Sequence, residues 1–401
     1  MSPPRVVVER TGEGALLALV DDDGLAAFLD GRDLQDRLGA ALWLGRVAAI
    51  DRHLDGAFLD IGRDRPAFLA AKDARYLKPE ARRQPIHKLL HEGERLIVQG
   101  LREADGDKGP RVTAGVVLDG PALRYRPRQD APGVGGGMRG RLREGLAARA
   151  EALFAGEGFI LRPVAARLDD DALLTEAARL RAVWREAEAR TATGRTGAVT
   201  RDASAFDRRV WELLERAPAS FEAVDEAVLA HLRRLLDALP EDARPELVRL
   251  RGQSAFTAGG VAEDLAQARA REVPLPGGGR LVIEPTAACV AVDVDGGGRA
   301  ALDADLEAAT VLGRQIRLRN LGGTIVVDFV DLPTKPQRQR LEEALRRAFN
   351  GDPLPVQIYP MSPLGIVQIS RARRGGTALD AVGRPCPTCG GSGVIEGEEA
   401  R

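Results

Sequence analysis

The chain has 401 residues, of which 44% are hydrophobic and 29% are charged, and its formal net charge at pH 7 is −1. This length and composition exclude a disordered protein and predict several subdomains with buried cores. Because the net charge is close to zero, composition alone does not indicate a nucleic-acid partner. Such a partner has to be inferred from local groups of residues.

The amino terminus lacks the apolar run of a signal peptide, and no stretch of about 18 apolar residues is present to span a bilayer. Three cysteines are too few for a dense disulfide framework and fit a reducing compartment better. We therefore expect a cytoplasmic protein without a membrane span.

Five short strand signals fall between residues 36 and 119. They cover residues 42–50, 56–62, 66–70, 95–99 and 112–118. Glycine, proline and charged turns separate them, and this pattern predicts a small barrel such as an OB-fold. A glycine-rich basic connector at 132–141 is predicted to be a flexible loop. The pattern from 142 to 236 is mostly helical, with one apolar strand at 159–161.

The pattern changes again between residues 280 and 371. Strands are predicted at 281–284 and 289–295, paired around Pro285, and further strands at 325–331, 356–359 and 366–370. Helices are predicted over 304–319 and around Leu341, Leu345 and Phe349. Alternating helices and apolar strands predict an α/β sandwich for this half of the chain.

Three aspartates on these strands are candidates for chemistry. Asp293 and Asp295 are two residues apart, so both project from the same face of their strand. Asp328 interrupts an apolar run, where a carboxylate is costly unless it is paired or bound to metal. Magnesium suits a pair of carboxylates on neighbouring strands, because it needs only one or two carboxylate ligands. From spacing alone, strand-end caps or pairing with arginines explain these aspartates equally well.

A Cys-x-x-Cys pair, Cys386 and Cys389, precedes the sequence Gly-Gly-Ser-Gly. Two thiolates at this spacing form half of a tetrahedral zinc site. Cys289 lies in a predicted strand and is better explained as a small core residue. A symmetric partner chain is then the economical source of the two missing ligands. A redox dithiol or a disordered tail are the alternatives.

Four of the aromatic residues fall in the predicted barrel, although the whole chain is only 4% aromatic. They are Trp43, Phe58, Phe68 and Tyr76. Barrel aromatics belong to the core more often than to the surface. Exposed aromatics beside Lys108 and Arg111 would stack bases and neutralise phosphates, as single-strand binders do.

Together these segments resemble the ribonuclease E/G family along most of the chain. The matching motifs occur in order at residues 56–62, 108–113, 274–283, 292–295, 305–309, 317–331 and 386–389. The resemblance implies a multi-subdomain α/β fold. Its parts are an RNase H-like subdomain (1–35 and 217–277), an inserted S1 barrel (36–119), a 5′-sensor region (120–216), a DNase I-like catalytic subdomain (278–380) and a zinc link with tail (381–401).

The resemblance also implies roles for the acidic residues. Asp293 and Asp328 match the family's magnesium-binding aspartates. Asp295 stands where the family usually has an asparagine that contacts the scissile phosphate, and Asp305 also replaces a usual asparagine. An anionic Asp295 near the phosphate would repel it unless it is protonated or bound to metal, and this repulsion disfavours efficient cleavage.

For RNA contacts, Phe58, Phe68 and Lys108 match positions that clamp single-stranded RNA. Arg162 matches an arginine that senses a 5′-monophosphate, although Pro163 replaces the threonine that usually follows. Cys386 and Cys389 match zinc ligands shared between two chains, so a homodimer is expected. The chain stops soon after this pair, which favours a dimer over a tetramer.

We therefore expect a magnesium-dependent, single-strand-specific endoribonuclease of RNA processing or decay, which leaves 5′-phosphate ends. One alternative is an RNA-binding protein of the same fold with weak or lost nuclease activity, which Asp295 favours. Another is a hydrolytic zinc enzyme centred on the cysteines. It is disfavoured because Cys386 and Cys389 lack a nearby histidine or catalytic carboxylate.

Overall fold

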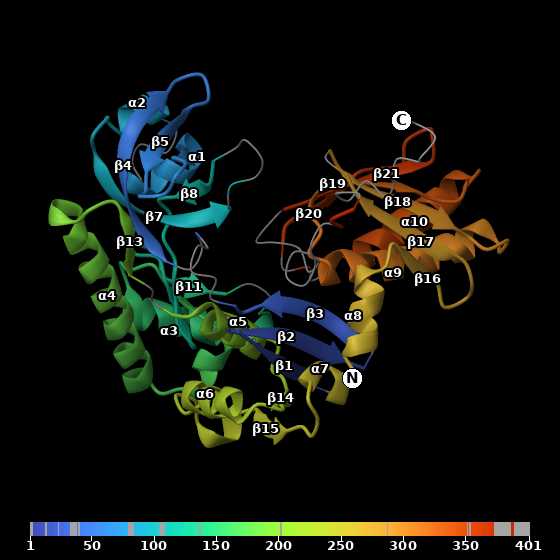
Figure 1. Ribbon diagram of the computed structural model, residues 1–401, viewed down its shortest axis with the longest axis horizontal. Helices are drawn as coiled ribbons and strands as arrows, with labels where there is room; N and C mark the ends of the chain where they lie inside the picture. The colour runs from blue at the N-terminus through green and yellow to red at the C-terminus, as the bar shows by residue number, and fades with distance from the viewer. Residues whose placement is uncertain are drawn as a thin grey trace. The chain divides into compact units, whose positions relative to one another are not determined.

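The computed structural model describes most of the chain (Figure 1). The described residues are 3–12, 14–22, 24–32, 38, 41–78, 84–102, 104, 109–135, 138–200, 203–286, 288–350, 352, 354–372 and 386–388. The chain divides into two compact units, Met1–Leu25 with Leu29–Ala262, and Ala26–Phe28 with Glu263–Arg401. Within the described ranges, no helix combines the length and apolar character that a membrane crossing requires.

The first unit contains a five-stranded sheet with the order β15-β14-β1-β2-β3. Its strands are β1 (Arg5–Thr11), β2 (Gly14–Asp21), β3 (Gly24–Asp30), β14 (Ser220–Ala223) and β15 (Glu246–Arg249). β1 pairs antiparallel with β2 and parallel with β14. The consecutive residues Val6, Val7 and Val8 are all buried, which is typical of a central strand covered on both faces. Helices α5 (Ala205–Leu214), α6 (Glu226–Leu236) and α7 (Ala255–Ala258) pack against this sheet.

The same unit contains a closed barrel. Its elements are β4 (Leu42–Asp51), β5 (Gly56–Asp60), β6 (Ala67–Ala70), α1 (Ala71–Ala74), η2 (Arg75–Leu77), α2 (Ile86–Leu89), β7 (Arg95–Arg102) and β8 (Arg111–Thr113). The order β4-β5-β6-β8-β7 closes on itself, because β7 pairs with both β8 and β4. The small five-stranded barrel predicted from the sequence is therefore confirmed. Its last strand ends at Thr113, and Leu118 belongs to another sheet.

That further sheet has four strands in the order β11-β12-β10-β9. Its strands are β9 (Leu118–Asp119), β10 (Leu123–Tyr125), β11 (Gly133–Val134) and β12 (Phe159–Leu161). The other elements in this part of the chain are α3 (Gly140–Phe154), η4 (Pro163–Arg167), α4 (Asp170–Thr193) and β13 (Gly197–Thr200), which are not strands of this sheet. The strand expected at 159–161 is confirmed. The expected loop at 132–141 is wrong in part, because Gly133 and Val134 pair with β12 and α3 begins at Gly140.

The second unit is built on a six-stranded sheet with the order β16-β17-β18-β19-β21-β20. Its strands are β16 (Glu272–Pro274), β17 (Arg280–Pro285), β18 (Val290–Asp295), β19 (Gly323–Asp328), β20 (Val356–Ile358) and β21 (Ile366–Arg371). The helices packed on this sheet are α9 (Ala301–Leu318) and α10 (Lys335–Ala348). Earlier in the chain are η5 (Glu241–Ala243), which belongs to the first unit, and α8 (Ala262–Arg269). β18 and β19 are parallel, and α9 connects them. The mixed α/β class predicted from the sequence is confirmed.

One face of this sheet packs against α9 and α10. Its buried residues include Leu281, Val292, Val294, Ile325, Val327 and Val367, which form one core with Leu312, Ile316, Leu341 and Leu345 of the helices. The intervening strand residues point to the other side and are exposed or half-buried. We call this side the open face; its residues include Glu272, Arg280, Val282, Asp293, Asp295, Val326, Asp328 and Gln368.

Candidate functional site

Asp293 and Asp328 lie directly side by side on the open face. They are register partners on the adjacent parallel strands β18 and β19, and both side chains are exposed. Neither carboxylate has a hydrogen bond or an ion pair with any residue in the described part of the chain. Two like charges on neighbouring strands, with no cation of the protein between them, form a pair suited to a divalent ion.

The local sequence explains why these carboxylates face outward. In β18, Val292 and Val294 point into the core, so Asp293 and Asp295 must point away from it. In β19, Val327 is buried and Asp328 follows it. The connection from β18 through α9 to β19 places the carboxyl ends of both strands together, which is where open α/β sheets bind their ligands.

Asp328 is not the buried carboxylate that the apolar run suggested. The strand ends at Asp328 instead of continuing to 331, and its last side chain is exposed. The expectation of a high desolvation cost at this position is therefore wrong. The feature that favours a metal ion at Asp328 is its unpartnered neighbour Asp293 and not burial.

Asp295 has partners of its own, in contrast to Asp293 on the same strand. One of its oxygens, Oδ1, accepts a hydrogen bond of 3.0 Å from the backbone N–H of Gly297. The other, Oδ2, lies 3.5 Å from Nε of Arg280, its register partner on β17. Arg280 also donates from Nη1 to Glu272 on β16 at 3.3 Å. The negative charge of Asp295 is therefore offset by a cation within the open face.

Asp305 lies inside the second unit, in the first half of α9, and is fully buried. Its Oδ1 accepts a 3.1 Å hydrogen bond from the backbone N–H of Val330, just beyond the end of β19. Its Oδ2 is buried without a hydrogen-bond partner among the described residues. Burial raises the pKa of this carboxyl to about 7, and the hydrogen bond from Val330 opposes the shift only in part.

On the barrel, Phe58 and Phe68 are neighbours across strands β5 and β6. Their ring centroids are 5.4 Å apart, and both residues are half-buried on the outer surface. Arg111, opposite Phe68 on β8, forms an ion pair with Asp73. A Cβ atom at Gly56 would overlap the Phe68 ring, so this glycine leaves the space that the ring occupies.

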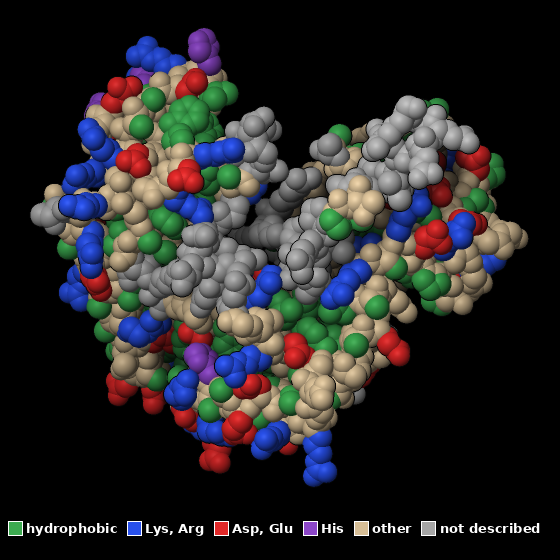
Figure 2. Space-filling view, in the orientation of Figure 1, with side chains coloured by type: hydrophobic (Ala, Val, Ile, Leu, Met, Phe, Trp, Pro, Cys, Tyr) green, Lys and Arg blue, Asp and Glu red, His purple; other side chains and the backbone are tan. Residues whose placement is uncertain are grey.

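Hydrophobic side chains gather over the barrel in the space-filling view, next to charged ones (Figure 2). Trp43 is not part of that surface, because it is buried and its indole N–H donates to the carbonyl oxygen of Leu38. Lys108 lies outside the described residues. Phe58 and Phe68 thus lie half-buried on the outer surface of the barrel, whereas Trp43 does not reach that surface.

Arg162 is almost completely buried, with 2% of its surface exposed. It follows β12, and its guanidinium donates to Asp119 at 2.6 Å and to Glu215 at 2.5 Å. A third hydrogen bond goes to the carbonyl oxygen of Trp211. Two carboxylates thus occupy the groups with which this arginine would contact a phosphate.

Of the two cysteines expected to bind zinc, Cys386 is exposed and Cys389 lies outside the described residues. Cys289 is half-buried just before β18, and its carbonyl oxygen accepts a hydrogen bond from Thr286, so it is not the core residue expected. Among the residues that the structure describes, no group of three or more histidine, cysteine or acidic side chains could hold a metal ion.

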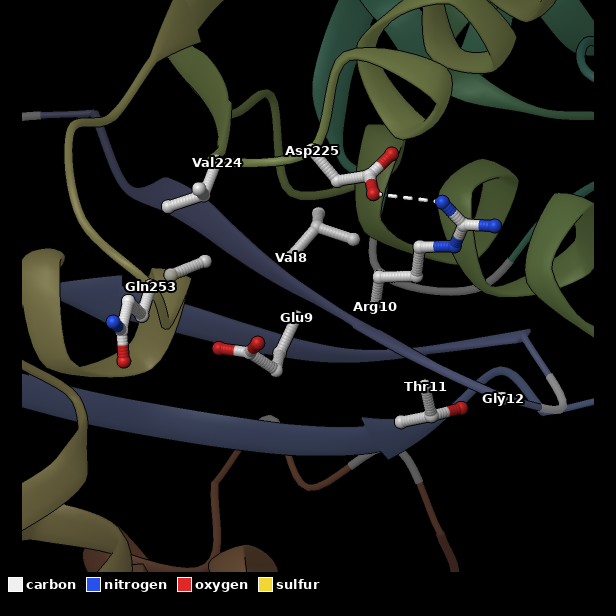
Figure 3. Close-up of a pocket in the computed structure, with 9 residues that line it drawn as sticks. Val8, Glu9, Arg10, Thr11, Gly12, Val224, Asp225 and Gln253 are labelled. Carbon is white, nitrogen blue, oxygen red and sulfur yellow. Dashed lines mark hydrogen bonds and ion pairs between the residues drawn. The ribbon is translucent and has the colours of Figure 1, made fainter.

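The first unit also contains a cavity of about 560 Å³ beside the ends of β1 and β14 (Figure 3). Its charged groups already have partners. Arg10 forms a 2.8 Å ion pair with Asp225, which caps α6, and Glu9 accepts hydrogen bonds from Ser254 and Phe256. These contacts give each charged group a role in holding helices α6 and α7 to the sheet.

A sequence profile of the ribonuclease E/G family matches residues 125–374, which include the open face and Arg162. The chain belongs to the ribonuclease E/G family. Ribonuclease G of Salmonella typhimurium is 29% identical to it over 412 residues, covering 95% of this chain and 84% of that protein. Ribonuclease E of Escherichia coli strain K12 is 30% identical over 421 residues, covering 99% of this chain and 39% of that protein.

Membership of the ribonuclease E/G family confirms the expected enzyme class, a ribonuclease. The sequence predicts Asp293, Asp295 and Asp328 as site residues, and the structure brings all three onto one sheet face. Arg280 and Glu272, on the same face, were not predicted. The sequence pattern that could have identified Arg280 is the alternation of side chains in β17. Combined with the hairpin register, it places Arg280 opposite Asp295.

Proposed function

We propose that the chain is an endoribonuclease that hydrolyses single-stranded RNA with a magnesium ion bound by Asp293 and Asp328. The observation that supports this most is the adjacency of the two carboxylates across β18 and β19, without internal partners. Family membership supports the substrate class. Within the described residues the site offers two carboxylates and no third ligand, as is usual for magnesium, which otherwise takes waters and phosphate oxygens.

The residues of the chain have separate tasks in this proposal. Asp293 and Asp328 hold the ion on an exposed sheet face that a phosphodiester backbone can reach. When bound, magnesium supplies Lewis acidity toward a phosphate oxygen and lowers the pKa of water. The strands themselves are fixed by the core under α9 and α10, so the two carboxylates need little reorganisation to bind the ion.

Selection of single strands is proposed to reside on the barrel. Phe58 and Phe68 present two rings on its outer surface, and bases can stack on such rings only when they are free of a duplex. Arg111 lies beside Phe68 and offers positive charge to phosphates, although Asp73 already pairs with it. Lys108 is proposed to add a second cation.

The subdomain names implied by the resemblance remain part of the proposal. The order β15-β14-β1-β2-β3, with β1 parallel to β14 and antiparallel to β2, supports an RNase H-like sheet for the first unit. The sheet with α9 and α10 on one face is proposed to be the DNase I-like catalytic subdomain. Zinc bound by Cys386 and Cys389 of two chains is proposed to join a homodimer, and the protein is proposed to act in the cytoplasm.

The decisive experiment measures cleavage of a short unstructured RNA by the purified protein, with magnesium or with a chelator. Asp293→Asn and Asp328→Asn should each abolish cleavage while RNA binding stays nearly intact, because the barrel is unchanged. Glu343→Gln, which removes an exposed carboxylate from α10, is the matched control and should cleave normally. Full activity of either aspartate variant at saturating magnesium would refute the metal assignment.

A second measurement addresses strand selection by titrating a fluorescent single-stranded RNA. Phe58→Ala and Phe68→Ala should each weaken binding by about 1–3 kcal/mol, the usual contribution of one stacked base. Leu54→Ala removes an exposed hydrophobic side chain near the barrel strands and should leave binding unchanged. Equal losses in all three variants would mean that the rings contribute only general hydrophobic surface.

The second candidate function is an RNA-binding protein with weak or lost nuclease activity. It is favoured by one observation, the carboxylate of Asp295 on the same face as the proposed metal pair. Tight RNA binding by the wild-type chain without magnesium-dependent cleavage would favour this second function over the first.

A further inference from the structure

The rows of the open face place Arg280 close to the proposed metal pair. One row across the sheet consists of Glu272, Val282, Asp293 and Asp328, which are successive register partners. The neighbouring row contains Arg280 and Asp295. Arg280 is therefore diagonal to Asp293, a relation in which long side chains on adjacent antiparallel strands come within reach of each other.

The contacts of Arg280 show which way its side chain leans. Its Nη1 reaches Glu272, which belongs to the row of Asp293 and Asp328, while its Nε lies 3.5 Å from Asp295. The guanidinium therefore extends from its own row to the row of the metal pair, where it lies on the β16 side of Asp293 and not on the side of Asp328. Two carboxylates on either side of β17 hold it in that orientation.

Arg280 keeps donors available to a ligand. Its Nη2 has no hydrogen-bond partner among the described residues, and half of its side chain is exposed. A guanidinium presents its N–H groups in a planar fork that fits the oxygens of a phosphate, and it does so without exchanging a proton. In this respect Arg280 differs from the arginine of a surface ion pair whose N–H groups are all hydrogen-bonded.

We propose that Arg280 contacts a non-bridging oxygen of the scissile phosphodiester and that Asp295 and Glu272 position it. This inference rests on the proposed function. It assigns a use to Asp295, whose carboxylate would by itself repel the phosphate: the carboxylate orients the cation that attracts it. The contribution of Arg280 is electrostatic stabilisation of the charge that grows on the phosphate oxygens.

The test is single-turnover cleavage of a short unstructured RNA at saturating RNA and magnesium. Arg280→Met should lower the rate about tenfold to a hundredfold, the usual effect of losing a donor to a charged group. Asp295→Asn keeps an acceptor for Nε and should change the rate little. Arg271→Met removes an arginine that pairs with Glu284 on the same sheet, and this matched control should stay within about twofold of the wild type.

Chemical rescue separates direct contact from structural support. Guanidinium ion at a concentration that leaves the protein folded should restore part of the rate of Arg280→Ala and none of that of Asp293→Asn. An unchanged rate in Arg280→Met, or an equal loss in Arg271→Met, would overturn the inference, as would a loss that guanidinium cannot reverse. A wild-type chain that does not cleave RNA at all would instead overturn the proposed function, and this inference with it.

Discussion

At the scale of single residues, the surroundings of each aspartate decide what it can do. Asp293 and Asp295 share one strand and one face, yet Asp293 has no partner among the described residues while Asp295 is held by Gly297 and Arg280. Asp305 differs from both, because it is buried in α9 with one oxygen unpaired. Three aspartates of one unit thus differ in role: Asp293 is free to bind a ligand, Asp295 holds a cation, and the carboxyl of Asp305 resists ionisation.

Asp305 makes the stability of the second unit depend on pH. Its pKa is about 7 in the folded chain against 3.8 for an ordinary aspartate, so the folded state keeps a proton that the unfolded state releases between these values. The free energy of unfolding therefore falls as pH rises from about 4 to about 7 and stays low above that. Asp305→Asn removes this dependence.

We expect the stability of Asp305→Asn relative to the wild type to be greater at pH 8.5 than at pH 5.5, by about 2 kcal/mol. Urea unfolding at the two pH values measures the difference, and it cancels any constant cost of the unpaired amide. Asp303→Asn, an exposed change in the same helix, should show no such difference. A relative stability that does not vary with pH would mean that Asp305 is ionised in the folded chain.

At the scale of elements, β12 and η4 hold Arg162 between two carboxylates and so limit what it can recognise. Asp119 lies on β9 and Glu215 follows α5, so the arginine joins three elements of the first unit. Pro163, at the start of η4, has neither a hydroxyl nor a backbone N–H to offer a phosphate. These contacts support a structural role for Arg162.

We therefore expect cleavage of a 5′-monophosphorylated RNA to exceed that of its 5′-hydroxyl counterpart only slightly, as measured by parallel initial rates. Arg162→Met should destabilise the first unit by about 1–3 kcal/mol, because Asp119 and Glu215 lose their buried partner and keep only Arg124. Arg10→Met, which breaks an exposed ion pair in the same unit, should cost about 1 kcal/mol or less. A strong preference for the monophosphate would contradict this prediction.

At the scale of the whole molecule, the proposed zinc link predicts how chains assemble. Zinc held by Cys386 and Cys389 of two chains requires one ion per two chains. Cys386→Ser combined with Cys389→Ser should therefore release monomers, as measured by light scattering together with metal analysis. Cys289→Ser is the matched control and should leave the dimer intact, since that thiol lies beside Thr286 within one unit. A wild-type dimer that contains no zinc would show that another surface joins the chains.

The sequence by itself determined the features that depend on local pattern. Short strand signals between glycine, proline and charged turns predicted the barrel strands. Asp293 and Asp295 were predicted to share a face because the side-chain period of a strand is two whatever surrounds it. The apolar face of α9 followed in the same way from helical spacing. The ordered motifs identified the family before any geometry was known.

Only the tertiary structure decided the contacts that join distant segments. The register of β18 against β19 makes Asp293 and Asp328 partners, and that register depends on how α9 packs under the sheet. The β17 hairpin brings Arg280 to Asp295, α9 buries Asp305 against Val330, and two remote carboxylates enclose Arg162. Local sequence patterns do not predict these pairings, because the packing of whole elements determines side-chain partners and solvent exposure.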